Sequence, residues 1–159
     1  QEMTDRLKLM AGASWVRWSR FDQILVTGSQ GDTITQEIQD YSNAWAYSLG
    51  GEYQLNPQLA LRAGITLDFT PTNNDRRSVR IPSDDRRIFS IGAGWSPTDD
   101  LTLDFAYSYL TERGTSVSQE REDLLASEAT GGVPVGGATY SADYKNEVHG
   151  FGAQLTYRF

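Results

Sequence analysis

Hydrophobic and polar residues alternate along six stretches of the chain, and this period of two predicts β-strands rather than helices. In these stretches the odd-numbered positions are almost all apolar, whereas the even-numbered positions hold charged residues, Ser, Thr, Gln and many glycines. Successive side chains of a strand point to opposite faces, so the pattern predicts a sheet with one apolar and one polar face. The predicted strands cover residues 7–21, 44–55, 59–69, 88–96, 101–110 and 149–159.

Two further features favour a membrane-spanning sheet over a soluble sheet with one buried face. Aromatic residues of the apolar face lie mainly near the strand ends, as in the aromatic girdles of outer-membrane barrels. Connections also alternate in length: residues 56–58 and 97–100 are short, whereas 22–43, 70–87 and 111–147 are long. Within the last of these, Thr115–Glu120 and Thr139–Lys145 are expected to pair and to extend two strands above the membrane.

The C-terminus adds a third feature. The last strand alternates and ends on an aromatic residue, and it resembles the C-terminal signal that the bacterial barrel-insertion machinery reads; its apolar positions include Phe151, Leu155, Tyr157 and Phe159. With that end in the periplasm, all three long connections lie outside the cell. Six strands are fewer than the usual minimum of eight for such barrels, so the chain is expected to be part of a larger one.

Composition narrows the function classes. The 159 residues carry a net charge of −7 with a pI near 4.6, which argues against a nucleic-acid partner. No run of 18 apolar residues occurs, which excludes a membrane-spanning helix but not a membrane barrel. There is no cysteine and one histidine, His149, for which no acid–base partner is evident. We therefore expect no enzyme activity, no metal and no cofactor.

Several ordered segments resemble one known family. They are Trp18–Phe21, Gly31–Thr33, Ala44–Gly50, Arg62–Ile65, Phe151–Phe159 and, most specifically, Ile81-Pro82-Ser83-Asp84-Asp85-Arg86. The chain resembles the C-terminal part of the FadL-type outer-membrane transporters of long-chain fatty acids and other hydrophobic compounds. The resemblance implies an all-β, antiparallel barrel of about fourteen strands. It also implies an N-terminal hatch, and the present chain would supply the last six strands without that hatch.

One position departs from the family. Members that take up fatty acids are expected to hold a basic side chain near the ligand carboxylate, where the alignment places Glu37. Two facing carboxylates are unfavourable unless one is protonated. The departure therefore favours a neutral ligand such as a hydrocarbon.

Other candidate ligand contacts lie in the long connections. Trp18, Phe21 and Tyr41 stand where the first two strands leave the membrane, and they could line an apolar path for the ligand or form an interfacial belt. Residues 76–87 hold five arginines, Arg80 among them. These could bind lipopolysaccharide phosphates or a fatty carboxylate, or they could form a solvated mixed-charge loop.

The polar face offers a predicted ion pair. Closing the short turn with Leu55 opposite Leu59 places Glu52 directly across from Arg62, an arrangement that favours a structural ion pair or a plug contact over a ligand site. The same register sets Trp45 opposite Phe69. In the next hairpin, pairing Trp95 with Leu101 would set Asp104 opposite Gly92, which leaves room beside the acid.

Together these features predict passive uptake of long-chain fatty acids or other hydrophobic compounds across the bacterial outer membrane. The expected partners are the hydrophobic ligand, outer-membrane lipid, lipopolysaccharide and the barrel-insertion machinery. Two alternatives stay open. One is a small outer-membrane barrel whose long loops have a structural or adhesive role, and the other is a soluble, lipocalin-like binding barrel.

Overall fold

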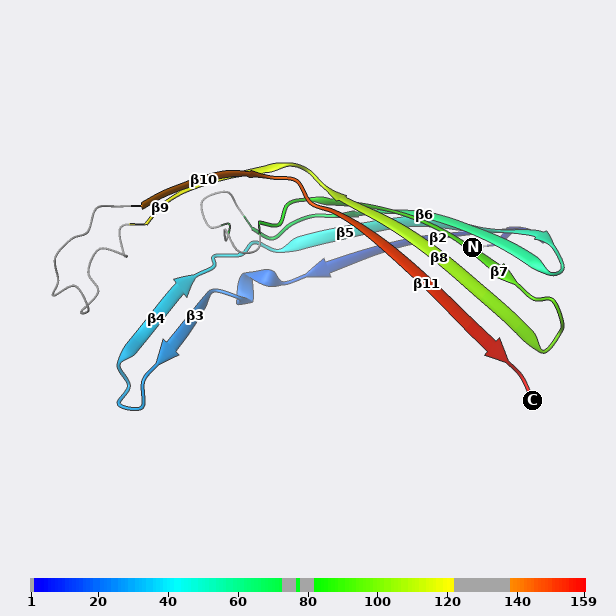
Figure 1. The fold of residues 1–159 in the computed structure, drawn as a ribbon, viewed down its shortest axis with the longest axis horizontal. Coiled ribbons are helices and arrows are strands. Elements are labelled where there is room, and N and C mark those ends of the chain that lie inside the picture. The colour runs from blue at the N-terminus through cyan, green and yellow to red at the C-terminus, as the bar shows by residue number, and fades with distance from the viewer. Residues whose placement is uncertain (1, 73–76, 78–81, 122–137) are drawn as a thin grey trace.

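The described chain forms an antiparallel sheet of seven strands. The computed structural model describes residues 2–72, 77, 82–121 and 138–159, and within them no helix is long and apolar enough to cross a membrane. The sheet is curved (Figure 1), and its strands lie in the order β1 (Glu2–Thr4), β2 (Leu7–Val16), β5 (Ala44–Asn56), β6 (Leu59–Asp68), β7 (Arg86–Trp95), β8 (Leu101–Glu112) and β11 (Glu147–Tyr157).

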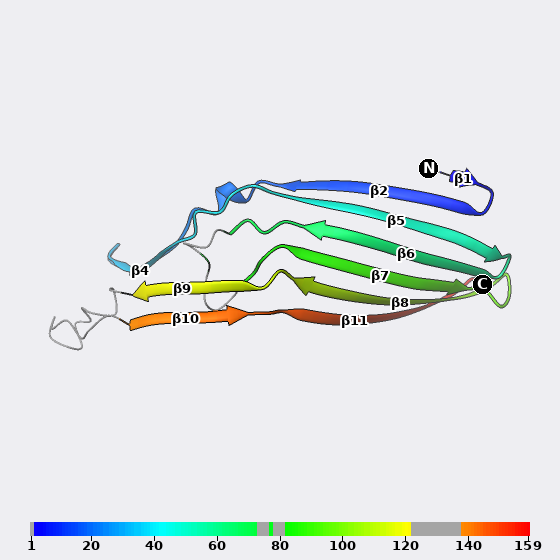
Figure 2. The same ribbon diagram turned by 90° about the horizontal axis from the view of Figure 1, so that it is seen from above.

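Two hairpins project from one end of this sheet, as Figures 1 and 2 show. They are β3 (Gln23–Thr27) with β4 (Thr33–Ile38), and β9 (Thr115–Arg121) with β10 (Ala138–Tyr144). We call this end the loop end and the opposite end, with its short connections, the turn end. The predicted pairing above β8 and β11 is confirmed, since Thr115 lies opposite Tyr144.

The first strand ends earlier than the sequence pattern predicts. β2 stops at Val16 rather than at residue 21, because a single 3-10 turn, η1 (Trp18–Arg20), follows it. This turn closes with a 2.7 Å hydrogen bond from the Phe21 amide to the Trp18 carbonyl. The next connection, expected to be a loop, contains the β3–β4 hairpin, whose tip uses the positive φ of +86° at Gly31.

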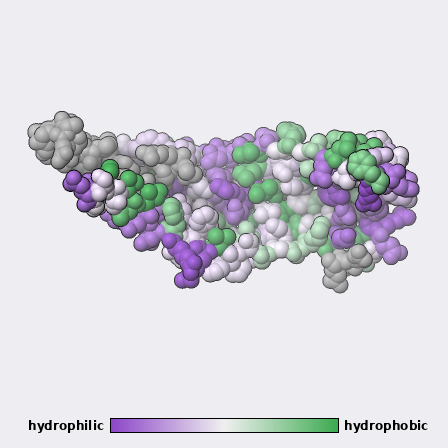
Figure 3. All heavy atoms as spheres, turned by 90° about the horizontal axis from the view of Figure 1, so that it is seen from below, coloured by the Kyte–Doolittle hydropathy of each residue, from purple (hydrophilic) through white to green (hydrophobic). Residues whose placement is uncertain are grey.

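The two faces of the sheet separate as the alternation predicts. Odd-numbered residues pair with odd-numbered ones across the strands; Tyr53, for example, lies between Leu7 and Leu61. The apolar odd face is strongly exposed: Leu49 keeps 59% of its surface accessible and Ile91 keeps 62%. Figure 3 views the opposite, concave side, where hydrophilic and pale residues alternate with a few apolar ones.

Little of the described chain is buried in a protein core. The buried hydrophobic residues are only Ala44, Ala60 and Val117 among the described positions. A convex surface with this much exposed apolar area is unstable in water and suits a hydrocarbon environment. The packing therefore favours the membrane over the soluble lipocalin-like alternative, in which the apolar face would line an interior.

Register differs from the prediction at both short turns. At the first turn a bulge sets Asn56, not Leu55, opposite Leu59, although Glu52 still faces Arg62. At the second turn, Trp95 lies opposite Leu103, two residues further along than predicted. A shift by two keeps each side chain on its face but changes its neighbours, because a period of two specifies the face alone.

Candidate ligand portal and concave wall

Three aromatic side chains meet at the loop end of β2 and β5. The Tyr41 ring contacts Trp18 edge-on with centroids 6.2 Å apart, and it contacts Phe21 edge-on at 5.3 Å. Trp18 and Phe21 remain 42% and 38% exposed. We call these three residues the aromatic triad. The structure thus brings together three of the five residues predicted to contact ligand, from two segments joined by the β3–β4 hairpin.

For the other two predicted ligand contacts the structure gives a backbone position in one case and no description in the other. Glu37 lies in β4, opposite Ile24 of β3 in the backbone register. Arg80 lies outside the described residues. Neither is shown to join the aromatic triad.

A row of charged side chains crosses the concave face near the turn end, and we call it the charge row. Arg62 is its centre: its Nε donates to Oε2 of Glu52 at 2.7 Å, and its Nη1 donates to Oδ1 of Asp104 at 2.6 Å. Lys8 on β2 lies directly opposite Glu52, and Gln154 on β11 lies directly opposite Asp104. The predicted ion pair is therefore present, within a larger array that spans five strands.

Asp104 reaches Arg62 across an intervening strand. Asp104 lies on β8 opposite Gly94 of β7, not opposite Gly92 as the predicted register had it. A Cβ atom at position 94 would come within 2.9 Å of Asp104 Oδ1 and within 3.1 Å of a guanidinium nitrogen of Arg62. Cβ atoms essentially never approach another atom to 2.9 Å, so the absence of a side chain at Gly94 leaves room for the ion pair to pass over β7.

Beside the charge row the concave wall is hollowed. A recess of about 680 Å³ is lined by glycines of β6, β7 and β11 together with Arg62, Asp104 and Gln154. Since the Arg62 guanidinium already binds two carboxylates, it is engaged rather than open to an anionic ligand. The recess is therefore lined by few large side chains and is bordered by polar ones.

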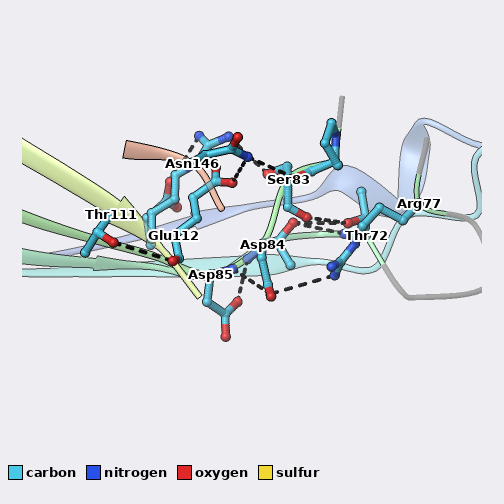
Figure 4. Close-up of polar contacts among 12 residues, drawn as sticks. Thr72, Arg77, Ser83, Asp84, Asp85, Thr111, Glu112 and Asn146 are labelled. Carbon is cyan, nitrogen blue, oxygen red and sulfur yellow. Dashed lines mark hydrogen bonds and ion pairs between the residues drawn. The ribbon is translucent and has the colours of Figure 1, made fainter. Parts of the chain in front are cut away.

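A second polar cluster, which sequence reasoning missed, lies where the strands reach the loop end (Figure 4). We call Ser83, Asp85, Arg86, Glu112 and Asn146 the loop-base cluster. The Glu112 side chain is only 8% exposed, and it accepts hydrogen bonds from Arg86 Nε at 2.9 Å and from Asn146 Nδ2 at 2.6 Å. Arg86 also donates to Ser83 Oγ at 3.0 Å.

Backbone contacts tie the same cluster to a fourth strand. Asp85 Oδ1 accepts from the Thr70 amide at 2.9 Å, beyond the end of β6, and the Asp85 carbonyl accepts from the Arg113 amide at 3.0 Å. The cluster therefore joins the ends of β6, β7, β8 and β11. The signal available in the sequence was a set of opposite charges just past the ends of neighbouring predicted strands.

The convex face carries an aromatic group around the single histidine. His149 Nδ1 shares a 2.8 Å hydrogen bond with the Tyr107 hydroxyl, and its ring lies 5.1 Å from that of Tyr109. The sequence pointed to no acid–base partner for His149, and the structure gives its ring a tyrosine hydroxyl as hydrogen-bond partner. Tyr107 also packs against Phe151, whose side chain is 83% exposed. At the turn end Tyr157 meets Phe159 edge-on at 5.3 Å, and Leu155 is 66% exposed.

Shifted ionisation at the loop end has simple local causes. Lys145 Nζ binds Glu147 Oε1 at 2.9 Å, and this hydrogen bond raises the pKa of Lys145. A hydrogen bond between the hydroxyls of Tyr140 and Tyr144 raises the pKa of Tyr144.

Among the described residues, no group of three or more His, Asp or Glu side chains could hold a metal ion.

Comparisons with known proteins agree with this architecture. A family model described as "Outer membrane protein transport protein (OMPP1/FadL/TodX)" matches residues 1–159. The crystal structure of a Pseudomonas aeruginosa FadL homologue superposes with a TM-score of 0.81 and 31% identity, covering 98% of this chain and 33% of that one.

Curated relatives agree with this match. The chain is 29% identical to outer membrane protein P1 of Haemophilus influenzae, over 99% of this chain and 33% of the relative. It is 28% identical to the long-chain fatty acid transport protein of Escherichia coli K12, over 67% of this chain and 24% of that protein. The chain therefore spans about a third or less of the length of these relatives, and its sheet corresponds to part of a barrel.

Proposed function

Since the chain belongs to the OMPP1/FadL/TodX family of outer-membrane transport proteins, we propose that it forms part of the wall of a barrel through which hydrophobic compounds cross the bacterial outer membrane. Uptake is passive: the ligand partitions into apolar surface at the loop end and moves down its gradient. The remaining strands and a hatch that fills the barrel belong to the same proposal, by resemblance to the family.

The aromatic triad is the observation that carries this proposal. Trp18 and Phe21 come from the segment after β2 and Tyr41 from the segment before β5, so the triad is built from separated parts of the chain. Aromatic rings offer a large apolar contact area that loses little conformational freedom on binding. The rings of Trp18 and Phe21 are partly exposed and both pack against Tyr41. This arrangement is suited to binding an apolar molecule at the loop end.

The presence of Glu37 in the β3–β4 hairpin and the paired state of Arg62 in the wall favour a neutral ligand over a fatty acid. Glu37 occupies the position at which fatty-acid transporters are expected to hold a base, and a carboxylate ligand would be repelled there. Arg62 already binds Glu52 and Asp104. The charge row supports a role in contacting the hatch rather than the ligand, because a hydrocarbon gains nothing from a solvated ion pair.

Uptake by whole cells tests the proposal. The full-length protein is expressed in cells without an uptake system of their own, and the accumulation of a labelled alkane, a labelled aromatic hydrocarbon and a labelled long-chain fatty acid is measured. We expect uptake of the neutral compounds to exceed that of the fatty acid. The double variant Trp18→Ala/Tyr41→Ala should lower uptake severalfold, and Glu37→Lys should shift the preference toward the fatty acid.

The matched control is Trp95→Ala. Trp95 is an equally exposed aromatic residue at 47%, but it lies on the convex face at the turn end, so uptake should stay unchanged. Folded protein in the outer membrane is quantified for each variant. Equal uptake by the triad variant and the wild type, at equal amounts of folded protein, would refute the portal, and no uptake of any compound would refute the transport function.

A further inference from the structure

Three cationic residues lie at neighbouring register positions at the loop end of β7, β8 and β11. Arg87 lies on β7 opposite Leu67 and Thr111, both of the apolar face. Arg113 follows β8, and Lys145 precedes β11 at the corresponding position, because the Glu112 amide binds the Asn146 carbonyl at 3.0 Å between them. We call Arg87, Arg113 and Lys145 the cation cluster.

The cluster is open to its surroundings and exceeds its acidic neighbours in charge. All three side chains are exposed. Glu147 pairs with Lys145, but among the described residues no carboxylate lies within ion-pair distance of Arg87 or Arg113. By contrast Arg86, on the other face, is held by Glu112 and Asp68. Asp85 lies in register with Arg113, where its carboxylate accepts a hydrogen bond from the Thr70 amide. The three cations therefore stand against two carboxylates, Asp85 and Glu147, which leaves one net positive charge.

Aromatic and polar groups continue from the cluster toward the middle of the sheet. His149 and Tyr109 lie opposite each other on β11 and β8, one step below Glu147 and Thr111. The Tyr107 hydroxyl, one step further, binds His149 Nδ1 at 2.8 Å. Amphipathic rings of this kind are typical of the headgroup level of a membrane.

An apolar hollow begins where these polar groups end. It measures about 820 Å³ and shares Tyr107 with the group above it. The large side chains Leu61, Ile91, Phe105 and Phe151 surround the small Ala93 and Ala153. Arg62, Gly92, Ala106 and Gly152 of the even-numbered face also border the hollow, but most of its lining is odd-numbered. We therefore place the hollow on the face toward the membrane hydrocarbon.

We propose that the cation cluster and the hollow form one binding site for a phosphorylated, multiply acylated glycolipid of the lipid A class. Phosphate oxygens bind the guanidinium groups of Arg87 and Arg113 and the ammonium group of Lys145, since guanidinium recognises phosphate with paired hydrogen bonds. An acyl chain fills the hollow between Phe105 and Phe151. Along the strands the cations come first, then the amphipathic rings, then the apolar hollow. This order matches that of the phosphates, the sugar headgroup and the acyl chains in such a lipid. This site does not depend on the transport function.

Lipid binding by the purified full-length protein tests the site. The protein is delipidated in detergent, and the binding of bisphosphorylated lipid A, dephosphorylated lipid A and phosphatidylglycerol is measured by native mass spectrometry. We expect the tightest binding for bisphosphorylated lipid A. The triple variant Arg87→Gln/Arg113→Gln/Lys145→Gln should bind it roughly a hundredfold more weakly, because each cation near an anionic lipid contributes about a factor of five.

A matched triple variant controls for overall charge. Arg6→Gln/Lys8→Gln/Arg158→Gln removes three exposed cations at the turn end and should leave lipid A affinity within about twofold, since these charges lie beyond a Debye length from the cluster. Equal weakening by both variants, or unchanged binding by the cluster variant, would overturn the site. Binding of phosphatidylglycerol as tight as that of lipid A would overturn the assignment to the glycolipid.

A second variant tests the hollow separately. Ala153→Phe fills the hollow beside Phe105, whereas Ala11→Phe adds the same ring to the convex face of β2, outside it. Lipid A affinity should fall severalfold for the first variant only, with folding checked by the heat-dependent shift in electrophoretic mobility. Equal affinity of the two folded variants would contradict the placement of an acyl chain in the hollow.

Discussion

Gly94 shows how a single small residue can decide the arrangement of its charged neighbours. Glu52 and Arg62 meet on adjacent strands, but Asp104 reaches Arg62 only across β7. Any side chain at position 94 would occupy that path. The ion pair and the glycine therefore depend on each other.

The first prediction concerns Gly94→Ala. The added Cβ would lie 2.9 Å from Asp104 Oδ1, so the carboxylate of Asp104 and the guanidinium that it binds must move away from β7. We expect a loss of about 1–3 kcal/mol in the free energy of unfolding, the usual range for overpacking. Reversible urea unfolding of the folded full-length protein in lipid vesicles measures it.

A neighbouring glycine and a double variant provide the controls. Gly12 lies on the same face with no atom within 4 Å of an added Cβ, so Gly12→Ala should change stability by less than about 0.5 kcal/mol. In the background Asp104→Ala, the further change Gly94→Ala should cost much less than it does alone. Additive losses in the double variant would show that Gly94 acts independently of the ion pair.

The sequence alone predicted part of this residue-scale picture. The Glu52–Arg62 pair followed from the length of one short turn, and the turn's bulge lies after the pair, so the prediction is confirmed. The predicted partner of Asp104 was wrong. The register between β7 and β8 depends on the conformation of residues 96–100, and the alternation of polar and apolar residues does not encode that conformation. The Tyr107–His149 contact could not be predicted for the same reason, because it depends on the register between β8 and β11.

At the scale of elements, the loop-base cluster fixes how the long connections leave the sheet. β8 runs to Glu112, past its predicted end at residue 110, and β11 begins at Glu147, before its predicted start at residue 149. Arg86 likewise begins β7 two residues before the predicted start. Polar side chains at these positions break the apolar pattern. The pattern therefore located these three strands but made β7, β8 and β11 too short at the loop end, whereas it made β2 too long there.

The second prediction concerns Glu112→Ala. Removing this nearly buried carboxylate leaves Arg86 Nε without its acceptor and leaves Asn146 Nδ2 only the Pro82 carbonyl at 3.3 Å, which should cost about 1–3 kcal/mol locally. The backbone amides of Thr70 and Arg113, both bound to Asp85, should then exchange hydrogen at least about tenfold faster. Hydrogen–deuterium exchange with mass spectrometry measures this.

An exposed pair nearby serves as the reference. Lys145 and Glu147 form an ion pair at the same end of the sheet but in solvent, and such pairs add little to stability. Lys145→Gln should leave exchange at the Thr70 and Arg113 amides unchanged. If Glu112→Ala behaves in the same way, the loop-base cluster does not hold the connections together.

At the scale of the whole molecule, the sheet has two faces that suit different solvents. The sequence pattern predicted both faces because alternation depends only on strand geometry. It did not predict η1 or the β3–β4 hairpin, which begin where polar and apolar residues cease to alternate. The long connections are specified by local turns and single contacts rather than by a repeating pattern.

The orientation of these faces is the central claim, and site-directed fluorescence tests it most directly. These 159 residues contain no cysteine, so a single cysteine introduced here has no competing thiol within this part of the protein, and the full-length protein without the introduced cysteine gives the background labelling. Adjacent positions are compared within two strands: Leu49 with Ser48 on β5, and Ile65 with Thr66 on β6. The full-length protein is folded into vesicles that contain a lipid-bound quencher, and the quenching of each label is measured.

We predict strong quenching by the lipid-bound quencher at positions 49 and 65, and weak quenching at positions 48 and 66, where a water-soluble quencher should act instead. This result would establish the odd face as the lipid-facing surface and the concave face as the wall of the barrel interior. The reverse pattern, or equal quenching at adjacent positions, would contradict a membrane-spanning sheet with this orientation.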